Sequence, residues 1–293
     1  MTMVESAPGV VSEHSLLRQL TVIQAGRYAR HPLFWGPVLV VLVPATAATA
    51  DDAPNSYFTL SDNVAVAFIV GVLGMLVAYR LTRTEDRALA LLPSAPVAAS
   101  TRTLALLGAC LVPATVGLVA LVVRLVTWAT YPPPPELVEL AGGWPPILAM
   151  QVSGFVVACF GGPALGVAVG RWLPFPGAGL LMAVALTVTE AFMVGGSVQI
   201  DGVGGTWPGR ITGSAMPWQD WIAVDTIDGV DVLNGLRPGS MYGAFLFAIS
   251  LCALAAWAAV MKDAEGAVRA RWTRLGWLFG TAAAGSYLWT LLG

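Results

Sequence analysis

Charged residues are scarce in this chain of 293 residues, and lysine occurs only once, at Lys262. Charged side chains make up 11% of the sequence, whereas hydrophobic residues make up 57%. Because a soluble domain needs a surface on which about a quarter to a third of the residues are charged, this composition excludes a soluble globular protein. The single lysine does not belong to a Gly-x-x-x-x-Gly-Lys-Ser/Thr motif, which excludes a phosphate-binding loop of that kind from the sequence.

Residues that could support catalysis inside a membrane are also scarce. The two histidines, His14 and His31, lie outside the apolar segments. The sequence contains no His-x-x-x-His pair, no Gly-x-Ser-x-Gly motif and no cluster of aspartates within an apolar segment. We therefore expect no enzyme activity in this chain, and no catalytic, cofactor-binding or metal-binding residues.

Cysteine is rare as well, with three residues at Cys110, Cys159 and Cys252. All three fall inside apolar segments, far apart in the sequence and without the spacing of metal ligands. The pattern favours small buried hydrophobic side chains over a disulfide or a metal site.

What the sequence does contain is seven apolar stretches near the length needed to cross about 30 Å of hydrocarbon as a helix. They cover residues 33–50, 63–81, 104–128, 146–170, 177–196, 241–261 and 275–292. The sequence therefore predicts an all-α fold, a polytopic bundle of transmembrane helices.

The basic residues indicate the orientation of this bundle, because loops on the cytoplasmic side of a membrane are enriched in arginine and lysine. The intervening segments on one side hold 12 of the 15 basic residues, namely Arg18, Arg27, Arg30, Arg80, Arg83, Arg87, Arg102, Arg171, Lys262, Arg269, Arg271 and Arg274. The opposite loops hold Arg210 and Arg237 among many acidic residues. We expect the N-terminus inside the cell and the C-terminus outside.

We expect residues 1–293 to form a single transmembrane domain. Residues 1–32 would be a cytoplasmic tail with a helix from Leu16 to about Arg30, and residues 33–293 would hold the membrane helices and an external stretch at 197–239. The first helix could lie in the membrane interface or simply lead into the first crossing. The stretch up to residue 50 also imitates a cleavable signal peptide, although such a leader would be unusually long.

Two connecting segments are distinctive. Residues 82–97 begin with charged residues and continue as a short helix-capable stretch that two prolines end, a pattern that fits either a solvated loop or a short helix. The external stretch 197–239 is rich in Gly, Trp and Asp, and it could form a re-entrant or interfacial element.

Two ionisable residues fall within apolar segments, Arg124 in the third and Glu190 in the fifth. Such residues usually face a partner or a wet cavity, so the two could form a functional or structural pair, or Arg124 could extend to the external interface. Gly162, Gly166 and Gly170 form a ladder of small residues in the fourth segment, which favours close packing within the chain over dimerisation.

The order of these parts resembles the membrane subunit of type-2 ATP-binding-cassette (ABC) exporters in the form found in high-GC Gram-positive bacteria. The likeness lies in Gly26-Arg27-Tyr28-Ala29-Arg30-His31-Pro32-Leu33, in the segment from Glu85 to Arg102 with its Leu-Leu-x-Ser-Ala-Pro core at 91–96, and in the stretch from Met241 to Asp263. It extends over most of the chain, and the seventh segment at 275–292 departs from it.

This resemblance implies a six-helix permease core, here with an added seventh helix, in a bacterial cell membrane. It implies an interfacial helix at 16–30 and a coupling helix at 85–96 that docks on a separate ABC ATPase, where ATP and magnesium would bind. It also implies a second permease subunit that completes the translocation path. The expected docking residues are the polar Glu85, Asp86 and Arg87, the apolar Leu89, Leu91 and Leu92, and Pro96.

Two other functions compete with this interpretation. An ATP-independent secondary transporter would need ion-coupling groups at mid-membrane, for which Glu190 is the only candidate in the sequence. A membrane scaffold or assembly protein that transports nothing would use the external Trp- and Asp-rich stretch as a partner surface.

Overall fold

The computed structural model describes residues 13–36, 38–39, 63–91, 97–133, 135–140, 142–199, 222–227, 230–235 and 238–292. The helices are α1 (Glu13–Ala29), α4 (Asn63–Leu91), α5 (Ala99–Ala109), α6 (Leu111–Thr130), α7 (Pro135–Leu140), α8 (Trp144–Val152), α9 (Ala158–Trp172), α10 (Ala178–Gln199), α12 (Pro238–Met261) and α13 (Gly266–Leu292). A π-helical turn, Ser153–Val157, joins α8 to α9. The strands are β1 (Ile222–Ile227) and β2 (Val230–Gly235).

Four helical stretches in the described part of the chain are long and apolar enough to cross a membrane: Val66–Ala88, Ala99–Thr130, Trp144–Trp172 and Met241–Met261. They coincide with four of the predicted crossings, at 63–81, 104–128, 146–170 and 241–261. The predicted crossing at 177–196 falls on α10, whose fully described part, Ala178–Thr189, is an apolar helix. The chain thus has the character of a multi-pass membrane protein, while the number of seven crossings stays a prediction.

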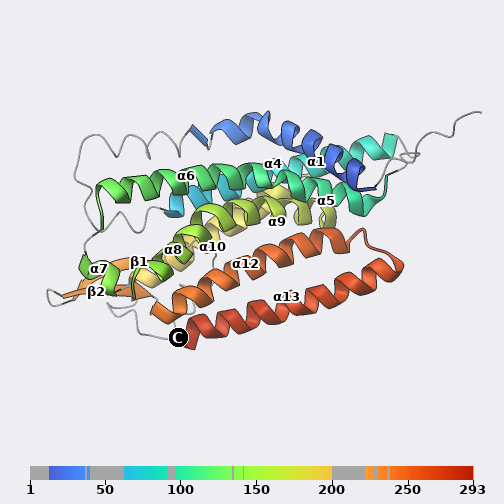
Figure 1. The fold of residues 1–293 in the computed structure, drawn as a ribbon. Coiled ribbons are helices and arrows are strands. Elements are labelled where there is room, and N and C mark those ends of the chain that lie inside the picture. The colour runs from blue at the N-terminus through green and yellow to red at the C-terminus, as the bar shows by residue number, and fades with distance from the viewer. Residues whose placement is uncertain are drawn as a thin grey trace, which may run out of the picture.

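The first and last predicted crossings have different outcomes. Most of the crossing at 33–50 lies outside the described residues. The crossing at 275–292 is helical throughout its described length and belongs to α13, which lies antiparallel beside α12 (Figure 1). Helix α13 is not among the four stretches given above.

The helices form an elongated bundle (Figure 1). At one end of the bundle lie the last turns of α4, α9 and α12 together with the first turns of α5 and α13. We call this the basic end. The C-terminus and the β-hairpin lie at the opposite end. The described parts of the connections that the sequence predicted on one side of the membrane, 82–91, 97–102, 171–176 and 262–274, are thus gathered at one end of the bundle.

Helices α4 and α9 pack closely through the glycine ladder of α9. A Cβ atom on Gly162 would collide with the carbonyl oxygen of Gly71, and one on Gly166 would collide with that of Met75. One on Gly170 would lie 2.9 Å from the Thr82 side chain. The ladder therefore serves contact within the chain, as its sequence pattern favoured.

Helix α1 is held against the bundle by its last turn. The Tyr28 side chain is buried, and its hydroxyl donates a hydrogen bond to the Gly74 carbonyl oxygen of α4 at 2.9 Å. Thr21 packs close to Gly108 of α5, whereas Val22 and Ile23 are exposed. The bounds of α1 agree with the helix predicted at 16–30, and its place in the membrane interface stays a prediction.

A β-hairpin occupies part of the predicted external stretch. Strands β1 and β2 pair antiparallel from Ile222–Gly235 to Ile227–Val230. The β-branched residues of both strands favour extended backbone, and Asp228-Gly229, a frequent hairpin-turn dipeptide, stands between them in the sequence. The prediction of a helical bundle is therefore confirmed, and this hairpin is an addition that it did not include, because hydropathy alone does not separate a short strand from a loop.

The outer surface of the bundle is apolar on several helices. Exposed aliphatic side chains follow one another along α6 (Leu118, Val119, Val122, Leu125 and Val126), and others cover α10 and α13. Exposed apolar surface of this extent is typical of a membrane-facing protein. The three cysteines are buried and free, as their positions predicted.

Candidate functional site

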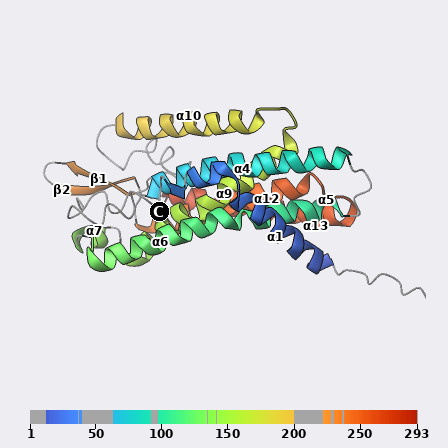
Figure 2. The same ribbon diagram turned by 90° about the horizontal axis from the view of Figure 1, so that it is seen from above.

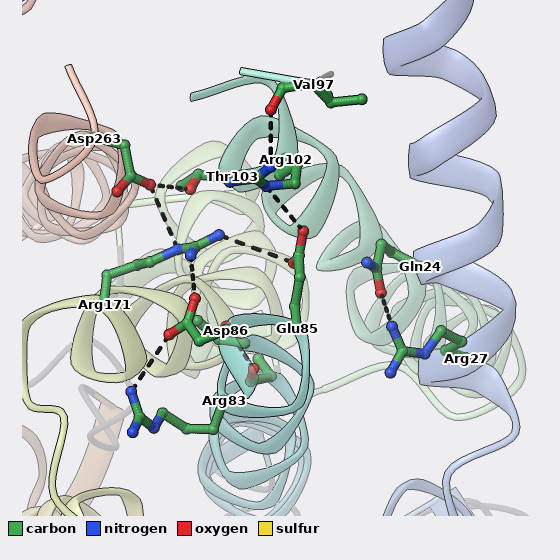
Figure 3. A network of polar contacts seen from close by, with 12 residues as sticks. Gln24, Arg27, Arg83, Glu85, Asp86, Val97, Arg102, Thr103, Arg171 and Asp263 are labelled. Carbon is green, nitrogen blue, oxygen red and sulfur yellow. Dashed lines mark hydrogen bonds and ion pairs between the residues drawn. The ribbon is translucent and has the colours of Figure 1, made fainter. Parts of the chain in front are cut away.

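A network of ion pairs connects the helices at the basic end, and Arg171 is at its centre (Figure 3). Its Nη1 contacts Oδ1 of Asp86, its Nη2 lies 3.9 Å from Oε2 of Glu85, and its Nε lies 3.5 Å from Oδ2 of Asp263. The Arg171 side chain is only 6% exposed. One guanidinium at the end of α9 thus contacts carboxylates of α4 and of the turn between α12 and α13.

Helix α5 joins this network through two side chains. Arg102 places Nε 3.6 Å from Oε1 of Glu85 and donates from Nη1 to the carbonyl oxygen of Val97 at 2.8 Å. The next residue, Thr103, donates a hydrogen bond to Oδ2 of Asp263 at 2.6 Å. The first turns of α5 are therefore attached both to α4 and to the turn after α12.

The turn that follows α9 is attached to α4 as well. Arg83 pairs with Asp86 at 3.4 Å and donates from Nη2 to the carbonyl oxygen of Pro174 at 2.7 Å. Tyr79 donates from its hydroxyl to the carbonyl oxygen of Phe175 at 3.0 Å. The position of the turn before α10 is thus fixed by side chains of α4.

The charges of the network balance, because three arginines (Arg83, Arg102 and Arg171) face three carboxylates (Glu85, Asp86 and Asp263). The Arg171 and Glu85 side chains at the centre are 6% and 10% exposed and are thus removed from water, whereas Arg83 and Asp86 at the edge are partly exposed. Oε2 of Glu85, Nε of Arg102, and Nε and Nη2 of Arg171 have ionic contacts but no hydrogen bond. A neutral, largely buried group of this kind adds little net stability, but the removal of one member leaves an uncompensated charge.

The segment predicted as a separate coupling helix is, in its described part, the end of a long helix. Helix α4 continues without a break from Asn63 to Leu91, so 85–91 extends the second crossing and does not start a new helix. No proline or glycine interrupts the sequence between Gly74 and Pro93, and the Arg83–Asp86 pair at i, i+3 supports helix there.

The predicted docking residues have different surroundings. Glu85 and Asp86 belong to the internal ion network, whereas Arg87 is exposed. Leu89 and Leu91 belong to α4, but their side chains lie outside the described part of the structure, as do Leu92 and Pro96 altogether. A role of these residues in docking therefore stays a prediction.

The two intramembrane charges lie on separate helices. Figure 2 places α6, which carries Arg124, and α10, which carries Glu190, at opposite edges of the bundle with α4 and α9 between them. The side chain of Glu190 lies outside the described part, so a pair between the two within the membrane stays a prediction.

The centre of the network, Arg171, and its partner Asp263 were not among the predicted site residues. Arg171 was counted only as a basic residue in a short connection, and Asp263 only as the end of the stretch 241–263 that carries the family resemblance. A signal for both was present, because the predicted topology already assigned residues 82–102, 171–176 and 262–274 to the same side of the membrane. Opposite charges in three connections on one side can meet.

No protein-family model, curated protein or solved structure matches this chain. The resemblance to type-2 ABC permeases therefore rests on the sequence features given above. The function has to be argued from the bundle and the ion network at its basic end.

Proposed function

We propose that this chain is the permease subunit of an ABC transporter, most consistent with an exporter, in a bacterial cell membrane. In this proposal it forms the translocation path with a second permease subunit, and a separate ATPase binds and hydrolyses Mg-ATP. The chain itself performs no covalent chemistry. The observation that carries the proposal is the ion network, which connects the ends of several helices at the basic end of the bundle.

A permease has to transmit movement of an ATPase to several membrane helices together. The end of α4 and the start of α5 flank the segment that would contact the ATPase. Arg171 connects α4 to α9 and to the turn between α12 and α13, and Thr103 connects α5 to the same turn. Because these connections are largely buried and mutually neutral, displacement of α4 would displace the other three elements with it.

Exposed residues of α4 next to the network are the best contacts for such a partner. Thr84 and Arg87 are exposed, whereas the neighbouring Glu85 and Asp86 already pair within the chain. We therefore assign the polar part of ATPase docking to Arg87. Reversal of Glu85 or Asp86 would disturb the ion network itself and would not report on docking alone.

The first test is purification of the tagged full-length chain in mild detergent from its native host, with mass spectrometry of the proteins that co-purify and an ATPase assay. We expect a stoichiometric nucleotide-binding subunit and ATP hydrolysis. Repeated recovery of the chain alone in several detergents would contradict the proposal and favour an ATP-independent transporter or a scaffold protein.

Two matched variants make the test specific to the docking surface. Arg87→Glu reverses an exposed charge on α4, and Arg269→Glu reverses an exposed charge on α13. Neither residue belongs to the ion network. We expect R87E to lose the co-purifying ATPase and R269E to keep it; equal recovery with both variants would remove Arg87 from the docking surface.

A further inference from the structure

A second feature of the basic end is a cleft of about 390 Å³ beside the ion network. Its walls come from three parts of the chain: His31 after α1, the last turns of α4, and Pro176 and Gly177 in the turn before α10. The residues of α4 that line it include three arginines, Arg80, Arg83 and Arg87. Among the described residues, none of those that line this cleft is a carboxylate.

The arginines lie on one side of α4 because they are spaced by three and four residues. Arg83 is partly neutralised, since it pairs with Asp86 and donates to the Pro174 carbonyl oxygen. Arg80 and Arg87 are exposed, and neither lies within ion-pair distance of a carboxylate in the described part of the chain. The cleft therefore has a net positive charge that nothing in these segments balances.

His31 adds a hydrogen-bond donor to the same cleft. Its Nδ1 accepts a hydrogen bond from the backbone N–H of Leu33 at 3.2 Å. In the neutral imidazole the proton is then on Nε2, which remains available as a donor. Two free guanidinium groups with a further N–H donor form a suitable site for an anion with several oxygen atoms, above all a phosphate.

The surroundings of the cleft favour a phosphate that carries acyl chains. Each wall stands where an apolar segment begins or ends: His31 comes just before residues 33–39, Arg80 lies near the end of the stretch Val66–Ala88, and Gly177 precedes α10. The apolar side chains next to these positions are exposed, with Trp35 at 51% and Leu180 at 62%. Free phosphate would gain nothing from such a surface, whereas a phospholipid would place its chains on it.

We propose that this cleft binds the phosphate of an anionic phospholipid headgroup, with Arg80 and Arg87 as its principal ligands. Basic pockets between membrane helices bind such headgroups in other proteins. The inference is argued from the cleft alone and does not depend on the proposed function, but the lipid site overlaps the proposed ATPase docking surface at Arg87. Because Arg83 belongs both to the cleft and to the ion network, a bound lipid would lie in contact with the group that connects the helix ends.

The test is native mass spectrometry of the purified, delipidated full-length chain, titrated with palmitoyl-oleoyl phosphatidylglycerol or with the corresponding phosphatidylcholine. We expect tighter binding of phosphatidylglycerol. In R80Q/R87Q, the affinity for phosphatidylglycerol should fall about tenfold or more, since each basic residue near an anionic headgroup contributes roughly a factor of five. The affinity for phosphatidylcholine should stay the same.

Two control variants and one competitor complete the design. R271Q/R274Q removes the same charge from exposed positions on α13 and should bind phosphatidylglycerol like the wild type. R80K/R87K keeps the charge and should retain the preference, which also shows that changes at these positions leave the fold intact. Inorganic phosphate should not displace the lipid.

Three results would overturn the proposal. The first is an unchanged affinity of R80Q/R87Q for phosphatidylglycerol. The second is an equal loss of affinity in R271Q/R274Q, which would indicate a general effect of surface charge. The third is displacement of the lipid by inorganic phosphate, which would assign the cleft to a soluble anion.

Discussion

Thr103, near the start of α5, donates a hydrogen bond of 2.6 Å to Asp263, which lies 160 residues later in the turn between α12 and α13. Asp263 also pairs with Arg171 at the end of α9. One carboxylate in a short turn is thus shared by two helices that precede it in the chain. The arrangement makes the turn part of the ion network and not merely a connection.

Loss of Arg171 should destabilise the chain more than loss of any other charge at the basic end. Arg171→Met leaves Glu85, Asp86 and Asp263 without their central partner, and the removal of one member of a buried ion pair costs about 3–5 kcal/mol. The measurement is thermal or denaturant unfolding in detergent, with Arg269→Met as the exposed control. A double variant, R171M/D263N, should recover part of the loss, because Asp263 has no other ion-pair partner among the described residues, whereas Glu85 keeps Arg102 and Asp86 keeps Arg83. No recovery would show that the packing of Arg171 matters more than its charge.

Removal of the Thr103 hydroxyl should weaken the connection between α5 and the turn after α12. Thr103→Val keeps the shape of the side chain and loses a hydrogen bond to a carboxylate, which costs about 1.5–3 kcal/mol. Thr273→Val is the matched control, because the Thr273 hydroxyl is exposed and bonds only within its own helix, to the Arg269 carbonyl oxygen. Equal melting temperatures for the two variants would argue against the connection.

A methyl group on the glycine ladder should separate α9 from α4. In Gly166→Ala the new Cβ meets the backbone carbonyl of Met75, which cannot move aside as a side chain would. We expect a loss of about 1–3 kcal/mol in unfolding free energy, as for other overpacked contacts. Gly280→Ala in α13 has open space around its Cβ and should be neutral or slightly stabilising. A neutral result for G166A would contradict the close contact of the two helices.

His31 should make the stability of the basic end sensitive to acid. Burial, and then the charge of Arg80, lower the pKa of His31 from its ordinary value of 6.5. A group whose pKa is lowered by folding stabilises the fold above the ordinary pKa, and this contribution is lost as the pH falls through the lowered value. Protonation would also remove the acceptor for the Leu33 N–H. We expect the melting temperature of the wild type to fall more between pH 7.5 and pH 5 than that of His31→Gln; parallel curves would exclude His31 as the cause.

The segment after the second crossing illustrates how far the residues could be interpreted on their own. Its charges, leucines and prolines fitted either a solvated loop or a short helix, and the resemblance to ABC permeases implied a helix at 85–96. The described part, 85–91, is helical. The sequence did not reveal that this helix is continuous with the crossing before it, because the boundary between a crossing and a following helix is a matter of backbone direction, not of composition. Nor did it reveal that Glu85 and Asp86 face inward, since their partners belong to other helices.

The β-hairpin and the glycine ladder show two further limits. The hairpin was missed because a stretch of weak hydropathy with several glycines and tryptophans looks like a loop, although β-branched residues in 222–227 and 230–235 favour strands. The ladder was noticed, and contact within the chain was favoured, but the partner helix α4 could not be named, because a row of small residues specifies close approach and not to which helix.

The amino-acid sequence alone determined the membrane class, most crossing positions and the gathering of basic residues at one end. The reason is that the free-energy cost of placing each residue in hydrocarbon is a local property that adds along the chain. Which charges meet is a different matter. Arg171 pairs with Glu85, Asp86 and Asp263 only because α9 packs against α4 and beside α12, and that packing depends on complementary surfaces of helices far apart in the sequence. The ion network and the arginine-lined cleft are therefore products of packing, whereas the end of the bundle at which they lie follows from the distribution of charge.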